Sequence, residues 1–153
     1  MMCHIALLLS LAVCLAGCGQ KQTEQEQKAV DAILKSGGYL TRDEKLPWRP
    51  VVRINLSNTK VMDSDLKDLK ELKGLRTLWL DDTQITDAGL KDLNELKGLL
   101  VLGLSRTQIT DAGLKELKEL KGLQWLYLSG TKITAAGLKE LNQALPATDI
   151  FGP

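Results

Sequence analysis

The chain has 153 residues, which is room for one domain on the usual scale of about 100 to 200 residues per domain. It carries 20 Lys and Arg against 19 Asp and Glu, for a formal net charge of +1. This balance gives no electrostatic basis for binding nucleic acid or an anionic membrane surface, so neither is an expected partner.

Residues 1–17 predict a signal peptide. Their apolar run, IALLLSLAVCLAG at 5–17, is too short to span a membrane, which takes about 20 residues, but suits the hydrophobic part of an export signal. The letters LAGC at 15–18 resemble the lipobox of bacterial lipoproteins. The resemblance implies that Cys18 becomes the lipidated first residue and that residues 18–23 form a tether. The alternatives are an ordinary signal peptide or an uncleaved anchor, in which Cys18 has no role.

The chain has three cysteines: Cys3 and Cys14 lie in the predicted signal peptide, and Cys18 follows it directly. The remainder therefore has no cysteine pair for a disulfide. We expect an exported protein that is lipid-anchored in the bacterial cell envelope. Gly19 after the cysteine resembles lipoproteins that are sorted to an outer membrane.

Residues 24–50 predict an N-terminal cap. The stretch EQEQKAVDAILK at 24–35 indicates a helix that stops before a Gly-Gly pair, and residues 39–42 indicate a strand beside residues 51–56. The helix places four apolar residues on one face: Ala29, Val30, Ile33 and Leu34.

Residues 51–145 repeat with a period of 24. TQITDAGLK at 83–91 returns unchanged at 107–115, and TKITAAGLK follows at 131–139. Within each unit, an L-x-L pair indicates a short strand with its leucines turned inward. Leucines at every third position, such as Leu90, Leu93 and Leu96, indicate a short helix on the opposite side. One unit cannot bury its leucines alone, but stacked units can.

The period and these letters resemble the leucine-rich repeats, specifically the bacterial T-x-I-T-D-A-G-L repeats of planctomycete-like proteomes. The resemblance implies an α/β solenoid, a short curved horseshoe of four repeats with a parallel sheet on its concave side and short helices on its convex side. It implies no catalytic activity. Residues 146–153 predict a last half coil, because Ile150 falls 24 residues after Leu126.

Polar residues recur where each strand turns toward its helix. Hydroxyls at these positions can satisfy backbone groups of the turn, and Thr86 and Thr110 are predicted N-caps. The turn threonines are Thr59, Thr83, Thr107 and Thr131.

Acid-before-base pairs at i, i+4 predict ion pairs on the exposed helix face. These pairs are Asp63 with Lys67, Asp87 with Lys91, and Asp111 with Lys115.

The solvent-facing strand residues form columns, and the most informative one contains Trp79, Gly103 and Tyr127. Strands lie about 4.8 Å apart, so the two rings are expected about 10 Å apart across the glycine, a gap that can grip a side chain or an extended peptide. Alternatively, Trp79 folds over Gly103 and shields the backbone. We expect Tyr39, Trp48 and Phe151 to be packing residues in the caps. The predicted partner-binding residues on the concave face are Arg53, Trp79, Asp81, Asp82, Gly103, Arg106, Trp125 and Tyr127.

These patterns predict a non-enzymatic module that binds a protein or peptide. The single histidine, His4, lies in the leader, so the remainder offers no Ser-His-Asp or Cys-His arrangement and no His ligand for a metal. No Gly-rich phosphate loop is present either, so we expect no cofactor. Two alternatives stay open: an envelope spacer without a specific ligand, and a substrate-recognition domain of the F-box type in a ubiquitin ligase. The sequence defines no oligomeric state.

Overall fold

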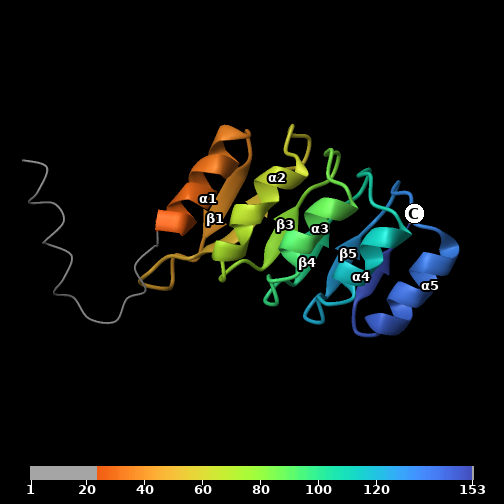
Figure 1. The fold of residues 1–153 in the computed structure, drawn as a ribbon. Helices are drawn as coiled ribbons and strands as arrows, with labels where there is room; N and C mark the ends of the chain where they lie inside the picture. Colours follow the sequence, from red (N-terminus) through yellow and green to blue (C-terminus); the bar gives the residue numbers. More distant parts are fainter. Residues whose placement is uncertain (1–23, 153) are drawn as a thin grey trace, which may run out of the picture.

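The computed structural model describes residues 24–152. The predicted signal peptide (1–17), Cys18 with its tether (18–23) and Pro153 lie outside the described residues. The elements follow one another along a solenoid, with strands on one side and short helices on the other (Figure 1). In chain order they are α1 (Glu24–Lys35), β1 (Tyr39–Arg42), β2 (Val51–Asn55), α2 (Asp63–Leu66), η1 (Lys67–Glu71), β3 (Thr77–Trp79), α3 (Asp87–Leu93), β4 (Val101–Gly103), η2 (Asp111–Gly113), α4 (Leu114–Leu117), β5 (Trp125–Tyr127), α5 (Ala135–Ala144) and β6 (Asp149–Phe151).

The six strands lie in the sheet in chain order. β1 is antiparallel to β2, and each later strand is parallel to the one before it. Equivalent residues of successive repeats are neighbours, so Leu78 lies between Ile54 and Leu102. Ile150 lies beside Leu126, which is the register that the sequence predicts for the last half coil.

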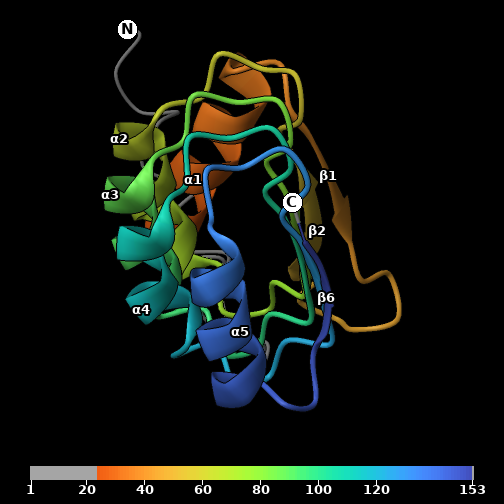
Figure 2. The same ribbon diagram turned by 90° about the vertical axis from the view of Figure 1, so that its right-hand side faces the viewer.

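Viewed from the C-terminal end, the coils superpose, with the helices on one side and the sheet on the other (Figure 2). The core between them consists of the leucines and isoleucines of the repeat, and Leu78, Leu102 and Leu126 are fully buried. This arrangement confirms the predicted solenoid of parallel strands and short helices.

Helix α1 packs on η1 and covers the N-terminal end of the core. Ala29, Val30 and Ile33 are buried against the first coil, but Leu34 is 55% exposed, so its predicted place on the buried face is wrong. Successive residues turn by about 100° around a helix, and the narrow end of one coil covers only the stripe that contains the other three. The helix ends at Lys35, and the turn that follows it contains Gly37, whose φ of +84° favours glycine.

The four turn threonines behave as the sequence predicts. Each hydroxyl donates a hydrogen bond of 2.6–2.7 Å to the carbonyl oxygen three residues earlier in the chain. Thr83 and Thr107, in the middle of the solenoid, are only 6% and 4% exposed. Their hydroxyls therefore satisfy carbonyl groups that water does not reach.

The aspartates of the repeat bind the next coil rather than a lysine of their own helix. Oδ1 of Asp87 accepts a hydrogen bond from the backbone N–H of Thr110 (2.9 Å), and Oδ2 accepts one from its hydroxyl (2.7 Å). Asp63 binds Thr86 in the same way, and Asp111 binds Thr134. None of the predicted i, i+4 ion pairs forms in residues 24–152, because these carboxylates are already held across the coil boundary.

The glycine of the repeated T-D-A-G leaves space for this contact. A Cβ on Gly89 would lie 2.5 Å from Oδ1 of Asp63, and a Cβ on Gly113 would lie 2.4 Å from Oδ1 of Asp87. Real Cβ atoms essentially never approach an oxygen so closely. In each T-D-A-G, the threonine therefore binds the aspartate of the preceding coil, and the glycine leaves room for that carboxylate. The aspartate of the same T-D-A-G binds the threonine of the next coil.

The two imperfect copies follow the same logic. The first copy, at 62–65, has Asp63, which binds the next coil, but has Met62 and Asp65 in place of the threonine and glycine that would bind a preceding coil. The last copy, at 134–137, has Thr134 and Gly137, which contact the aspartate of the preceding coil, but has alanine in place of the aspartate that would bind a next coil. Each copy thus retains the half of the contact for which the described chain supplies a neighbouring coil.

Candidate functional site

The solvent-facing side of the sheet, which we call the sheet face, carries two adjacent rows of side chains. Strand register places one residue of each strand in each row. The central row consists of Tyr39, Asn55, Trp79, Gly103, Tyr127 and Phe151. The lateral row consists of Thr41, Arg53, Thr77, Val101, Trp125 and Asp149.

Trp79 lies over Gly103. A Cβ on the glycine would lie 2.3 Å from Cε3 of the indole, and the ring centroids of Trp79 and Tyr127 are 5.2 Å apart at an angle of 40°. The predicted open gap of about 10 Å between the two rings is therefore wrong, and the alternative, in which Trp79 shields the glycine backbone, is correct. The indole fills the space because doing so removes apolar ring surface from water.

The aromatic contacts continue to the last strand. The rings of Tyr127 and Phe151 stack with centroids 4.7 Å apart and planes only 8° from parallel. Phe151 packs on Tyr127 but is still 46% exposed, and Tyr39, at the other end of the row, is 63% exposed, so neither is a buried residue of a cap. A 24-residue step from Tyr127 leads to position 151, and this register was the sequence signal for the third ring.

The lateral row adds one more exposed ring. Trp125 is 41% exposed and lies between Val101 and Asp149 on the neighbouring strands. Arg53 and Thr41 lie at the other end of this row. Aromatic side chains thus follow the central row from Trp79 to Phe151, with Trp125 beside them, and the two exposed charges of the lateral row lie near its ends.

Three of the predicted binding residues are engaged in turns beyond the strand ends. Asp81 accepts hydrogen bonds from the Ser105 backbone N–H (2.7 Å) and the Ser57 hydroxyl (3.3 Å). Asp82 and Arg106 form a two-fold hydrogen-bonded ion pair. That pairing lowers the pKa of the Asp82 carboxyl and raises the pKa of the Arg106 guanidinium.

Two charged side chains of the sheet face are not engaged. Arg53 and Asp149 form no hydrogen bond or ion pair through their side chains within the described part of the chain. Arg53 borders a small cavity of about 150 Å³. The residues that line this cavity are Tyr39, Thr41, Arg53, Ile54, Asn55 and Trp79.

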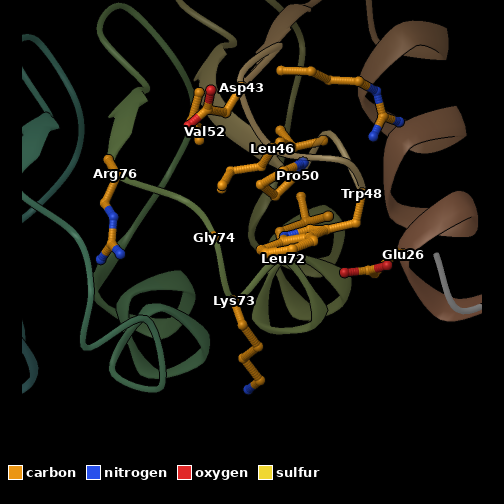
Figure 3. A pocket seen from close by; sticks show the side chains of 12 residues that line it. Glu26, Asp43, Leu46, Trp48, Pro50, Val52, Leu72, Lys73, Gly74 and Arg76 are labelled. Atoms are coloured by element: carbon orange, nitrogen blue, oxygen red, sulfur yellow. The ribbon is translucent and has the colours of Figure 1, made fainter. Parts of the chain in front are cut away.

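A larger cavity of about 360 Å³ lies at one edge of the solenoid, where α1, the β1–β2 loop and the turn after η1 meet. Figure 3 shows Leu46, Trp48, Pro50 and Leu72 gathered on one side of it, with the Lys73 side chain pointing away. Trp48 is 41% exposed, so it is not the buried cap residue that the sequence suggested. The cavity was not predicted, because the LPWRP loop lies outside the repeat.

No group of three or more His, Cys, Asp or Glu side chains in residues 24–152 is arranged to hold a metal ion. None of the helices described for this chain is long and apolar enough to cross a bilayer. The chemistry that the described side chains present on the sheet face is aromatic contact, hydrogen bonding and isolated charge.

Comparisons with known proteins agree with this architecture. Residues 73–133 match the family model described as leucine rich repeat. A comparison with curated proteins found no match. The chain has the leucine-rich repeat fold.

Solved structures include several of similar fold. A leucine-rich repeat protein of Leptospira interrogans is 24% identical with a TM-score of 0.52, over 67% of this chain and 26% of that chain. The actin-binding site 2 domain of leiomodin-1 is 14% identical with a TM-score of 0.55, over 85% of this chain and 79% of that chain. Internalin C2 of Listeria monocytogenes is 28% identical with a TM-score of 0.46, over 55% of this chain and 34% of that chain. The chain therefore spans only about a quarter to a third of the two bacterial proteins.

Proposed function

We propose that this chain is a non-enzymatic recognition module that binds a segment of another protein on its sheet face. The observation that carries the proposal is the continuous contact of Trp79, Tyr127 and Phe151 across that face, with Trp125 exposed beside them. Aromatic side chains supply large contact areas at little cost in conformational entropy, and they dominate the energetics of protein interfaces.

Shielding of the backbone accounts for only part of this surface. Trp79 covers Gly103, but Trp125 and Phe151 remain 41% and 46% exposed and cover no glycine of the sheet. Large apolar side chains grouped on one face favour a binding surface over a plain spacer.

The ring geometry favours a protein segment over a sugar polymer. Sugars stack on open ring faces, whereas Tyr127 and Phe151 turn their faces toward each other. The exposed parts of Phe151 and Trp125 offer apolar surface for aliphatic or aromatic side chains.

We also propose that the module is held at a membrane of the bacterial cell envelope by a lipid on Cys18. The LAGC letters and the apolar run before them support this part of the proposal. A tether of residues 18–23 would keep the sheet face close to the membrane surface. Replacing Cys18 with serine should abolish incorporation of labelled fatty acid, and labelling that persists in Cys18→Ser would contradict the anchor.

Affinity capture with the full chain tests the binding function. We compare the wild-type protein with Trp125→Ala/Phe151→Ala, and with a control that removes equally exposed apolar side chains elsewhere, Leu34→Ala/Met62→Ala. A captured protein is identified by mass spectrometry and its binding is repeated with both partners purified. Loss of that binding with the first variant, and not with the control, supports the proposal. Equal binding by all three proteins would favour a spacer or a site away from the sheet face.

A further inference from the structure

We propose that the sheet face binds each peptide in the orientation that the order of its charges sets, with a carboxylate at Arg53, a cationic group at Asp149 and uncharged apolar residues between. This inference rests on the proposed function and adds the chemistry of the partner. It follows from which charges on the sheet face are engaged and which are free.

The turn beyond the strands uses its own charges internally. Asp82 is paired with Arg106, and Asp81 accepts hydrogen bonds from the turns on both sides of it. These groups have little capacity left for a partner. Arg53 and Asp149 are exposed and have no side-chain partner among the described residues, so they are the charges that a ligand meets.

The surroundings of Arg53 suit a carboxylate. The cavity of about 150 Å³ beside it has room for a group of the size of a carboxylate. The Tyr39 hydroxyl accepts a hydrogen bond from Nδ2 of Asn55 (2.7 Å), which leaves its own hydrogen available to a ligand, and Thr41 also lines the cavity. A guanidinium fork with a nearby hydroxyl donor matches the acceptor pattern of a carboxylate.

Asp149 provides the opposite charge at the far end of the lateral row. It lies on β6, four strands from Arg53 on β2, which corresponds to about 19 Å at the usual strand spacing of about 4.8 Å. An extended peptide covers this distance with roughly six residues, at about 3.3 Å each. The positions between the two charges are Thr77, Val101 and Trp125, with the aromatic contacts alongside, and none of them carries a charge.

Opposite charges at the two ends determine the direction of binding. A peptide with an acidic group near one end and a basic group about six residues away pairs both charges in one orientation, whereas the reversed orientation places like charges together. The carboxylate can come from an Asp or Glu side chain or from a peptide C-terminus.

Two arrays of the same random dodecapeptides distinguish these sources. In one array the peptides are attached by the N-terminus and have a free carboxyl end, and in the other they are attached by the C-terminus. The full chain is applied in detergent micelles, as wild type, Arg53→Glu, Trp125→Ala and Lys91→Glu. Lys91 is an exposed lysine of α3 on the opposite side of the solenoid, so its reversal is the matched charge control.

We expect the wild type and Lys91→Glu to select the same peptides, with a carboxylate about six positions from a Lys or Arg. For the tightest peptide, Kd measured by fluorescence anisotropy should rise at least about ten-fold with Arg53→Glu. Converting the peptide carboxylate to an amide should cause a similar loss with the wild type and little loss with Arg53→Glu. Arg53→Lys should retain part of the affinity, because it keeps the charge without the fork.

Peptides that are lost with Trp125→Ala but bind Arg53→Glu unchanged would overturn this inference and leave the proposed function standing. If no bound peptide depends on Trp125, the sheet face does not bind peptides, and the inference falls together with the proposed function.

Discussion

The contact between successive coils can be tested at Gly89. In an ordinary helix, alanine is more stable than glycine by about 0.5–1 kcal/mol. At this position a Cβ would lie 2.5 Å from Oδ1 of Asp63 and 3.1 Å from Cδ1 of Leu66. The carboxylate is held by the Thr86 N–H and hydroxyl at 2.9 and 2.6 Å, so it cannot move aside without losing those bonds. We therefore expect Gly89→Ala to lower the free energy of unfolding by about 1–3 kcal/mol, as overpacking does.

Removal of the carboxylate should reverse the sign. Asp63→Ala alone loses two charge-assisted hydrogen bonds and should also destabilise the protein, by about 1–3 kcal/mol. In that background the space beside Gly89 is open, so Gly89→Ala should be neutral or stabilising by up to about 1 kcal/mol. The two substitutions should thus show a coupling of about 1–4 kcal/mol in favour of the double variant.

Urea unfolding of the full chain, followed by far-ultraviolet circular dichroism, measures all four proteins. The midpoints should shift while the dependence on urea stays unchanged, since the area exposed on unfolding is nearly the same. If Gly89→Ala stabilises the protein in both backgrounds, the aspartate does not require the glycine, and our explanation of the repeated T-D-A-G is refuted.

Three further predictions concern single positions. Thr107→Val should lower the free energy of unfolding by about 1–3 kcal/mol, because a buried hydroxyl no longer donates its 2.6 Å hydrogen bond, and an unchanged urea midpoint would contradict this. The hydrogen bonds that Thr134 donates lower the pKa of the Asp111 carboxyl in the folded state. The resulting stability is present above the unfolded-state pKa of about 3.9 and is lost as the pH falls through the lower folded-state pKa. Urea midpoints measured across that range should converge for the wild type and Asp111→Asn at low pH, and a constant difference would oppose the assignment. Gly103→Ala should displace Trp79 and destabilise the protein by about 1–2 kcal/mol with a change in tryptophan fluorescence, whereas the same substitution in Trp79→Ala should cost less but not nothing, because the new Cβ would still lie 2.6 Å from Oδ2 of Asp81.

The period of 24 was sufficient to predict the fold, because the same positions of every coil are buried in the core. An L-x-L strand and a three-residue leucine spacing define which side of each element is buried, and stacking then determines the sheet order and register. The structure agrees at Leu78, Leu102 and Leu126, which are adjacent and fully buried. Neither α1 nor β1 carries the repeat, and a helical pattern alone did not show that Leu34 would be exposed.

The partners of the repeated aspartates could not be predicted from local spacing. Asp87 lies four residues before Lys91 and 23 residues before Thr110, and the same letters permit either partner. The Asp87 carboxylate binds the threonine because Thr110 donates both a backbone N–H and a hydroxyl from one fixed turn. An ion pair with Lys91 would instead require an exposed lysine side chain to be ordered, at a cost in entropy. The imperfect copies indicate the correct partner. The first copy lacks the threonine and glycine that bind the aspartate, and the last copy lacks the aspartate.

The candidate site was predicted by position but not by conformation. Strand register alone places Trp79, Gly103 and Tyr127 in one row, and that part of the prediction agrees with the structure. Whether the Trp79 indole points away from the sheet or lies over Gly103 depends on its rotamer, and contacts with neighbouring rings determine that rotamer. The sequence pattern around Phe151 favours packing in a cap, because residues 146–153 form only a half coil, yet its strand register places it beside Tyr127 in the same row.

The distinction between repeated and unrepeated positions separates architecture from recognition. The turn threonines, the aspartates and the glycines recur because each coil must bind the next, so variation there costs stability. The rows of the sheet face contribute only their backbones to the sheet, and their side chains are free to differ from strand to strand. They do differ, from Arg53 at one end to Trp125 and Asp149 at the other. Because coil stacking does not require these differences, we infer that the binding of a partner explains them, and that this partner contacts the positions at which the strands differ.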